Sequence, residues 1–185
     1  MAENSGKIAV FLAMGFEEIE ALTTVDILRR AELQVETVGV GGPVVRGAHG
    51  VSVLADVTDE QWSVDGLSAV VLPGGMPGTL NLERSPVVQG ALDVAQQRGL
   101  WIGAICAAPS ILGHRGLLEG RTAVCFPGFE GELKGARLDD RPVVRDGRII
   151  TGRGAGVAVD FALCLAEQLA SPETAEKIRA GMQCR

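Results

Sequence analysis

Apolar runs alternate with amphipathic segments along most of this chain. Continuous apolar runs, which are typical of strands buried on both faces of a parallel sheet, occur at residues 7–14, 66–72 and 100–105, and residues 33–40 form an alternating run. Helical spacing of apolar residues predicts helices over residues 17–31, 86–98, 107–114, 157–169 and 171–182. Strands that alternate with helices indicate an α/β fold, with a mainly parallel sheet and helices on both faces.

Turn and cap residues refine this pattern. Two short extended runs at residues 43–46 and 51–55 flank a glycine-bounded loop and predict a small hairpin, and Asp146-Gly147 predicts a second hairpin between residues 142–145 and 148–151. Residues 122–126 are a further short strand by the same criteria. Ser85 and Ser171 each precede a proline and are expected to cap the helices that follow.

Composition limits the function classes. The chain has 185 residues, of which 46% are apolar and 22% charged, so a single globular domain over residues 1–185 is expected. A net charge of −6 without a run of Lys or Arg gives no footprint for nucleic acid or an anionic membrane, and no segment is long enough to span a bilayer. We expect small molecules or proteins as partners.

The four cysteines are scattered and form no CxxC pair. They predict neither a disulfide framework nor a zinc site, and free thiols fit a reducing cytoplasm. Residues 152–156 (GRGAG) do not follow the first strand as a dinucleotide-binding GxGxxG would, and no GxxxxGK[ST] motif occurs. We therefore expect no cofactor and no metal, with Arg153 supporting a pocket or binding an anion.

Cys106 ends the apolar run at residues 100–105, and a segment of small residues follows it directly. This order predicts a sharp strand-to-helix turn, similar to a nucleophile elbow, that aims the thiol out of the sheet. The start of the helix is expected to favour the thiolate. The same position also suits a small apolar residue packed at the end of a strand.

Three loops are expected to meet at the carboxyl ends of the strands, where ligands of such folds bind. They precede Glu20, contain Gly74-Gly75 and form the Cys106 turn. Glu20 is expected to face inward, with its pKa raised so that it donates a hydrogen bond to sulfur. The N–H groups of Gly75 and Ala107 are candidates for an oxyanion hole.

Other acids and both histidines have simpler interpretations. Glu17 and Glu18 are expected to be solvated acids at a helix start. His114 lies eight residues after Cys106 and is expected to be a helix-end residue, more than about 10 Å along the axis from the thiol. His49 is expected to be a solvated turn histidine, which reaches a pocket only through folding of its loop or from a neighbouring subunit.

Five separated motifs give the chain a family resemblance. They are GFEEIE at residues 15–20, VDILRRA at 25–31, LPGG at 72–75, AICAAP at 104–109 and TGRG at 151–154. In this order they resemble the ThiJ/PfpI superfamily, in the branch of the parkinsonism-associated deglycase. The resemblance implies a flavodoxin-like three-layer sandwich, usually a homodimer, with Cys106 as reactive cysteine, Glu20 as its protonated partner, and Gly75 and Ala107 as oxyanion-type amides. The aspartate that matches Asp26 is associated with an active-site histidine in relatives.

The chain departs from the family pattern at two positions. Glyoxalase-active relatives carry a histidine before the proline of a pocket loop, whereas Phe126 stands there in this chain and makes the pocket more apolar. Protease-like relatives carry a histidine directly after the cysteine, and here that residue is Ala107, which disfavours a peptidase. Cys125, beside Phe126, is either a second thiol or a buried structural cysteine.

The leading hypothesis is a cysteine-dependent stress-response enzyme of glyoxalase III or deglycase type, acting on a small reactive carbonyl or a glycated protein. Cys106 would add to the aldehyde while Glu20 moves protons. The alternative is a non-enzymatic redox sensor or chaperone in which peroxide converts Cys106 to a sulfinate. Another cysteine-dependent hydrolase or hydratase of the superfamily is a third hypothesis, based on fold analogy.

Overall fold

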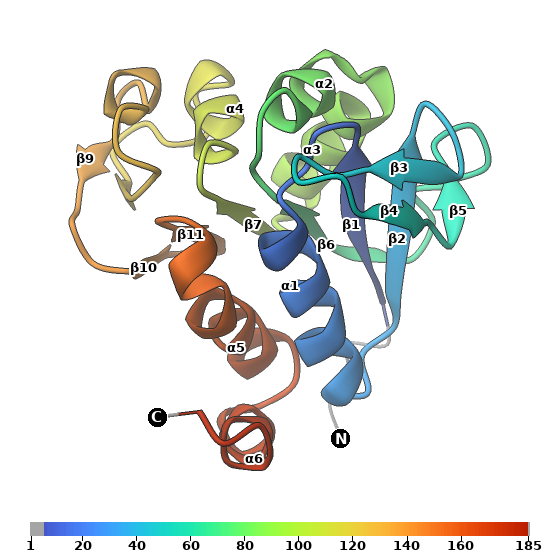
Figure 1. Cartoon of the computed structure of the whole chain (residues 1–185). Helices are drawn as coiled ribbons and strands as arrows, with labels where there is room; N and C mark the ends of the chain where they lie inside the picture. Colours follow the sequence, from blue (N-terminus) through green and yellow to red (C-terminus); the bar gives the residue numbers. More distant parts are fainter. Residues whose placement is uncertain (1–5, 185) are drawn as a thin grey trace.

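A seven-stranded sheet forms the centre of the molecule (Figure 1), in a computed structural model that describes residues 6–184. The strand order is β10-β11-β7-β6-β1-β2-β5, and every neighbouring pair is parallel except β10 with β11. The strands are β1 (Lys7–Ala13), β2 (Val35–Val40), β5 (Val57–Thr58), β6 (Leu67–Leu72), β7 (Trp101–Ile105), β10 (Val143–Asp146) and β11 (Ile149–Gly152). The predicted mainly parallel sheet is confirmed.

Helices cover both faces of the sheet, and β1 shows why the sequence dictates this. Its alternate residues enter different apolar layers: Ile8, Val10 and Leu12 pack with one set of helices, whereas Ala9, Phe11 and Ala13 pack with the other. The first layer holds α1 (Glu18–Arg30), α5 (Ala158–Leu169) and α6 (Pro172–Gly181), and the second holds α2 (Gly78–Arg84), α3 (Pro86–Arg98) and α4 (Pro109–His114). A strand buried on both faces has no polar alternation, which explains its continuous apolar run. The fold is the flavodoxin-like α/β sandwich that the motifs indicate.

Both predicted hairpins form. The first is β3 (Val44–Arg46) with β4 (Ser52–Leu54), which lies outside the central sheet, and the second is β10 with β11. The second hairpin does more than the turn signal predicts, because β11 also pairs in parallel with β7 and so extends the central sheet. Both serine caps are confirmed: Ser85 Oγ accepts a hydrogen bond from Val88 N at 3.4 Å, and Ser171 Oγ accepts one from Thr174 N at 3.1 Å.

Three local predictions need correction. The strand expected at residues 122–126 is only β8 (Thr122–Ala123), which pairs with β9 (Arg137–Leu138) outside the central sheet. The chain leaves the strand because Val124 N donates to Thr151 Oγ1 and Phe126 N donates to Cys106 O. The helix expected from residue 107 begins only at Pro109, because the three preceding residues form a turn. The sequence pattern also misses α2, which lies between the turn that contains Gly74-Gly75 and the helix that begins at Pro86.

Short 3₁₀ turns complete the set of helical elements. The 3₁₀ turns are η1 (Glu130–Glu132) and η2 (Ala155–Val157), and the latter leads directly into α5. Within residues 6–184, the helices are all too short or too polar to cross a membrane.

Candidate active site

The loops after β1, β6 and β7 meet at one edge of the sheet, because these three strands are neighbours in its middle. Backbone hydrogen bonds join the loops after β1 and β6 to each other and the turn after β7 to the end of β11. Glu17 N donates to Gly74 O at 2.9 Å, and Cys106 N donates to Gly152 O at 2.9 Å. Parallel strands that end at the same edge therefore place the predicted site residues within one small region.

Cys106 occupies the sharp turn between β7 and α4. Its φ angle is +65°, in the left-handed region that a residue with a side chain seldom adopts. Ser110 Oγ donates to Ala107 O at 2.7 Å and so helps to hold the turn. The predicted elbow geometry is confirmed, and the partly buried thiol points toward the layer that contains α1 rather than into open solvent.

Glu20 meets the elbow from α1. Its side chain is buried, with 1% of its surface exposed, and Oε2 accepts a hydrogen bond from Gly74 N at 2.7 Å. Oε1 is also buried and has no hydrogen-bond partner among the described residues. Burial raises the pKa of Glu20 from 4.5 to about 7, more than the Gly74 hydrogen bond lowers it. The Cys106 side chain is close enough to influence this pKa and lowers it without cancelling the rise.

Gly74 separates the two side chains and shows how closely they approach. A Cβ atom on Gly74 would lie 2.6 Å from Cys106 Cβ and 2.9 Å from Glu20 Oε2, closer than real Cβ contacts. Only glycine fits between the thiol and the carboxyl group. Gly75 is equally constrained, since its φ angle is +89° and a Cβ atom would lie 2.4 Å from Glu17 N.

The Cys106 thiol does not have the lowered pKa that its place before a helix predicts. Burial raises its pKa to about 12, and the negative charge and hydrogen bond of Glu20 add to this effect. The N–H groups of Gly75 and Ala107 donate to sulfur and oppose the rise without cancelling it. The two groups therefore titrate as a pair, in which a proton on Glu20 favours charge on sulfur.

Three predicted site residues lie apart from this pair within one chain. Phe126 is bonded to the elbow only through its backbone N, and its ring lies against Gly154 with 47% of the residue exposed. Arg153 Nη1 donates to Asp140 O at 3.0 Å and lines a shallow groove with Phe126. Asp26 is exposed on α1, where it forms an ion pair with Arg30 at 2.7 Å.

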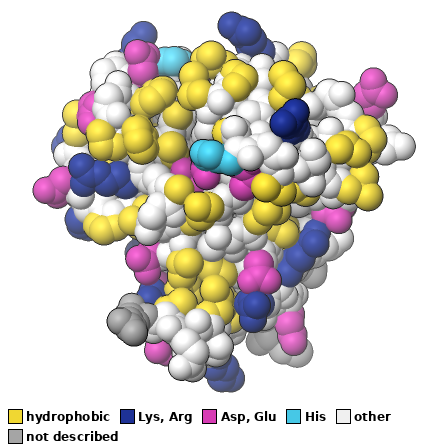
Figure 2. Space-filling view, in the orientation of Figure 1, with side chains coloured by type: hydrophobic (Ala, Val, Ile, Leu, Met, Phe, Trp, Pro, Cys, Tyr) yellow, Lys and Arg dark blue, Asp and Glu magenta, His cyan; other side chains and the backbone are white. Residues whose placement is uncertain are grey.

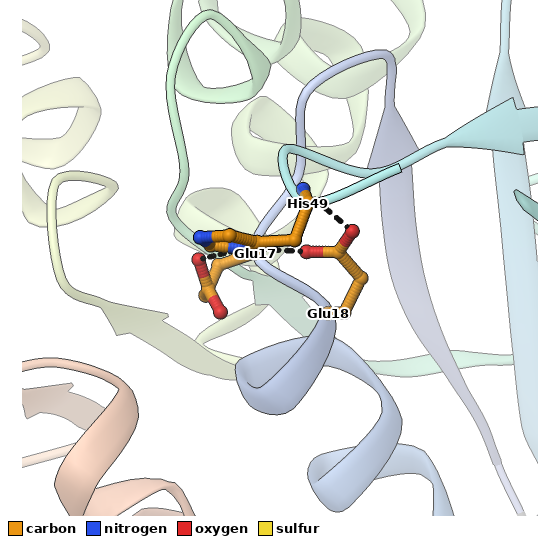
Figure 3. A group of neighbouring side chains, drawn as sticks. All are labelled: Glu17, Glu18 and His49. Carbon is orange, nitrogen blue, oxygen red and sulfur yellow. Dashed lines mark hydrogen bonds and ion pairs between the residues drawn. The ribbon is translucent and has the colours of Figure 1, made fainter. Parts of the chain in front are cut away.

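Glu18 departs from its expected solvated role, whereas His49, with 72% of its side chain exposed, lies in a turn as the sequence predicts (Figure 3). Glu18 is 7% exposed because the loop between β3 and β4 folds over its carboxylate, which accepts from His49 N at 2.7 Å and Val51 N at 3.3 Å. His49 Nδ1 lies 3.0 Å from Glu18 Oε2 and 3.4 Å from Glu17 Oε2. Gly47 is the sequence feature that could have indicated this closure of the loop, because a Cβ atom there would lie 2.4 Å from the Glu18 carboxylate.

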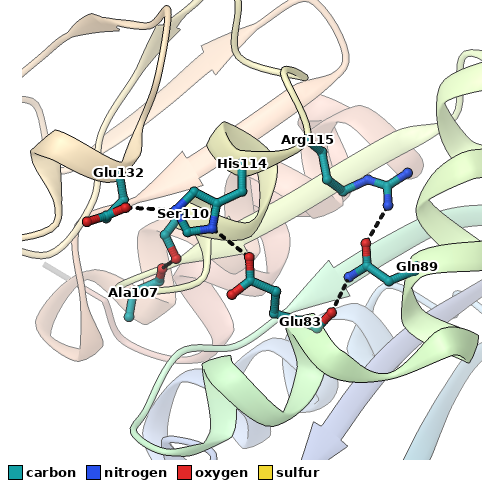
Figure 4. Close-up of polar contacts among 7 residues, drawn as sticks. All are labelled: Glu83, Gln89, Ala107, Ser110, His114, Arg115 and Glu132. Carbon is teal, nitrogen blue, oxygen red and sulfur yellow. Dashed lines mark hydrogen bonds and ion pairs between the residues drawn. The ribbon is translucent and has the colours of Figure 1, made fainter.

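His114 is the last residue of α4, as expected, and is held away from the thiol (Figure 4). Its Nδ1 lies 2.5 Å from Glu83 Oε1 and its Nε2 lies 2.8 Å from Glu132 Oε2, so both ring nitrogens are engaged. Both carboxylates raise the pKa of His114. Within residues 6–184, neither histidine hydrogen-bonds to Cys106 or Glu20.

Cys125 is a buried cysteine in the apolar layer on the other side of the sheet from the layer that Cys106 contacts. Burial raises the pKa of its thiol to about 11. All four cysteines are free. The structural interpretation of Cys125 therefore agrees with its surroundings better than the role of a second thiol.

The chain is similar to known proteins along most of its length. Residues 6–168 match the DJ-1/PfpI family. The chain is 38% identical over 176 residues to Protein dj-1beta of Drosophila melanogaster, covering 94% of each chain. It is 35% identical over 159 residues to the Glutathione-independent glyoxalase DJR-1.2 of Caenorhabditis elegans, covering 85% of this chain and 84% of the relative. Among solved structures, oxidized DJ-1 from Toxoplasma gondii has a TM-score of 0.92 at 34% identity, covering 96% of this chain and 98% of the other.

Proposed function

Because the chain belongs to the DJ-1/PfpI family, we propose that it is a stress-response enzyme that acts on reactive carbonyls through Cys106 and Glu20. The observation that carries this proposal is the buried pair itself. Glu20 Oε1 has no partner among the described residues, lies in a carboxyl group with a pKa of about 7, and is beside a thiol on a strained turn. A carboxyl group that holds and releases a proton near neutral pH is suited to acid and base chemistry.

The proposed reaction converts methylglyoxal and water to lactate. The Cys106 thiol first passes its proton to the Glu20 carboxylate. The thiolate sulfur then attacks the aldehyde carbon, a C–S bond forms, and the carbonyl electrons move to oxygen opposite the N–H groups of Gly75 and Ala107. Glu20 gives its proton to this oxygen. As a carboxylate, Glu20 then transfers the proton of the carbon that bears sulfur to the neighbouring carbonyl carbon, while the hydroxyl proton moves to the neighbouring oxygen. Water cleaves the resulting thioester, which releases lactate and restores the thiol, so no external oxidant or reductant is consumed.

For a glycated protein, the hemithioacetal or hemiaminal adduct first releases the protein thiol or amine and re-forms the free aldehyde, which the Cys106 sulfur then attacks in the same way. The relative named as a glutathione-independent glyoxalase supports the carbonyl substrate class for this chain. Because Phe126 stands where glyoxalase-active relatives carry a histidine, Glu20 would have to perform every proton transfer here. We therefore expect slower turnover than in a pocket that also contains an imidazole.

The test is incubation of the full chain with methylglyoxal, followed by separate assays of D-lactate and L-lactate. We expect lactate from the wild type, none above background from Cys106→Ala, and at least about a 100-fold lower rate from Glu20→Gln, since general acid and base catalysis contributes that much or more. Lactate production by Cys106→Ala equal to that of the wild type would remove the proposal.

A second candidate function is redox sensing, in which Cys106 becomes a sulfinate. Two molecules of peroxide would each deliver one oxygen atom to sulfur and leave as water. A protonated Glu20 can hydrogen-bond the sulfinate, no histidine is needed, and the oxidized state in which the Toxoplasma gondii relative was solved favours this candidate. Intact mass after mild peroxide treatment tests it: two added oxygens localised to Cys106 support it, whereas oxidation spread over methionines counts against it.

We further propose that the chain works as a homodimer in a reducing cytoplasm, where Cys106 stays a free thiol. Exposed apolar side chains on α1 and the first hairpin support self-association, with Ile19 at 56% exposure and Leu54 at 73%. Figure 2 shows hydrophobic side chains gathered in patches on this face. Light scattering coupled to size exclusion tests the assembly, and a monomer at every concentration would contradict it.

A further inference from the structure

A second group of side chains with metal-ligand chemistry lies beside the carbonyl site. It consists of Glu17, Glu18 and His49, whose ligand atoms all lie within 4.8 Å of one another. Figure 3 shows both carboxylates directed at one imidazole. The carboxylates come from the start of α1, and the imidazole comes from the loop between β3 and β4. None of the three is assigned a catalytic step in the proposed carbonyl chemistry, although the charge of Glu17 adds to the raised pKa of Glu20.

The loop is built around this group. The Glu18 side chain is 9% exposed, and its Oε1 accepts two backbone N–H groups, which leaves Oε2 directed at His49. Gly47 has no Cβ atom and so allows the loop to close on the carboxylate. The Glu17 side chain is 13% exposed, and among residues 6–184 its carboxylate contacts no cationic group other than His49.

The charges of the group do not balance. Two carboxylates that are largely shielded from water face a single imidazole, and one proton on Nδ1 can lie on the line to only one of them. Even a protonated His49 leaves a net charge of −1. Shielded carboxylates that lie side by side repel one another, and a cation between them removes that repulsion.

The distances match ligand spacing around a metal ion. Zn²⁺ bonds nitrogen and carboxylate oxygen at about 2.0–2.2 Å, so two ligand atoms lie about 2.9 Å apart at a right angle and about 3.4 Å apart at a tetrahedral angle. His49 Nδ1 lies 3.0 Å from the Glu18 oxygen and 3.4 Å from the Glu17 oxygen. The side chain of His49 is 72% exposed in the single chain, so it has room to adjust its position around an ion.

We propose that Glu17, Glu18 and His49 bind one divalent transition-metal ion of the Zn²⁺ class, with water in the remaining coordination positions. Imidazole nitrogen selects Zn²⁺ and its neighbours over Mg²⁺ and Ca²⁺, which prefer oxygen ligands alone. The ion would tie the hairpin loop to the start of α1. The sequence predicts no metal site, because His49 lies 31 positions from Glu18 and only the closed loop unites them.

The chain supplies a matched control for this proposal. His114 also faces two carboxylates, but they contact opposite ring nitrogens, Nδ1 at 2.5 Å and Nε2 at 2.8 Å. No single ion can lie between them and one nitrogen. His114→Gln should therefore leave metal binding unchanged, whereas His49→Gln and Glu17→Gln should weaken it.

The experiment is isothermal titration of the chelator-treated full chain with ZnCl₂ near neutral pH. We expect one Zn²⁺ per chain, and at least about a 10-fold weaker affinity in His49→Gln and in Glu17→Gln, since even partners outside the first coordination sphere contribute that much. Circular dichroism checks that each variant is folded.

A further variant distinguishes metal binding at Glu17, Glu18 and His49 from metal binding at Cys106. Cys106→Ala should keep the wild-type affinity, and Co²⁺ substituted for Zn²⁺ should give no sulfur-to-metal charge-transfer band. Loss of binding in Cys106→Ala, equal affinity in His49→Gln and wild type, or absence of binding to the wild type would each overturn the proposal. Because the readout is binding and not turnover, these results do not depend on whether the carbonyl reaction occurs.

Discussion

Replacement of Glu20 by glutamine should remove a large pH dependence from the stability of this protein. Glu20 is 1% exposed, and burial raises its pKa from 4.5 to about 7 in the folded chain. A group whose pKa is higher when folded contributes stability that is complete below pH 4.5 and is lost as the pH rises to about 7. The Glu20→Gln variant keeps an acceptor for Gly74 N and lacks the titrating proton.

The size of the effect follows from the pKa values. Each pH unit between the two values changes the free energy of unfolding by about 1.4 kcal/mol, so wild type loses roughly 3 kcal/mol relative to Glu20→Gln across this window. For a chain of 185 residues this corresponds to roughly 6 to 12 °C in melting temperature. The variant should therefore be similar to wild type in acid and more stable above neutral pH.

Urea unfolding followed by circular dichroism, at a series of pH values from acid to mildly alkaline, measures this difference. Subtracting the two curves cancels the groups that both proteins share, including the two histidines. Cys106→Ala tests whether burial causes the raised pKa. Because burial is the largest influence on the Glu20 pKa, this variant should keep most of the wild-type change of unfolding free energy with pH. A difference between wild type and Glu20→Gln that stays constant with pH would refute the reasoning.

Further predictions concern the packing of the site and its supports. Gly74→Ala should destabilise the fold by about 1 to 3 kcal/mol by thermal unfolding, because its Cβ atom would overlap the active-site side chains, whereas Gly90→Ala in the open interior of α3 should be neutral or stabilising. His114→Gln should be less stable than wild type below pH 6.5, and this deficit should disappear in urea titrations as the pH rises through the raised folded pKa of His114. Ser85→Ala should lower the free energy of unfolding by about 0.5 to 2 kcal/mol through loss of the cap on Val88 N, and an unchanged urea midpoint would contradict the assigned cap.

Much of the fold follows from local sequence pattern. Six consecutive residues of β1, from Ile8 to Ala13, are apolar because alternate side chains enter two different layers, so this requirement can be predicted from the sequence pattern. The elbow at Cys106 is similarly local, since a strand, one residue with positive φ and a run of small residues follow one another. The inward position of Glu20 follows from its spacing along α1, which places it on the buried face.

Other features depend on contacts that no local pattern encodes. Glu18 looks like a solvated acid in sequence, and it is buried because a hairpin loop 31 positions away closes over it. The ring of Phe126 lies against Gly154, and its backbone N donates to Cys106 O, and both contacts join residues far apart in the sequence.

The sequence by itself determined the layers, the strand-end position of the cysteine and the residues that accompany it, because periodicity records which faces are buried. The tertiary structure alone decided the charge states. A helix start near Cys106 predicts a lowered pKa, yet burial beside Glu20 raises it, because desolvation and a neighbouring charge depend on every segment that surrounds the thiol. Those segments come from three separate parts of the chain, and only their assembly makes the charge of Glu20 influence the pKa of the Cys106 thiol.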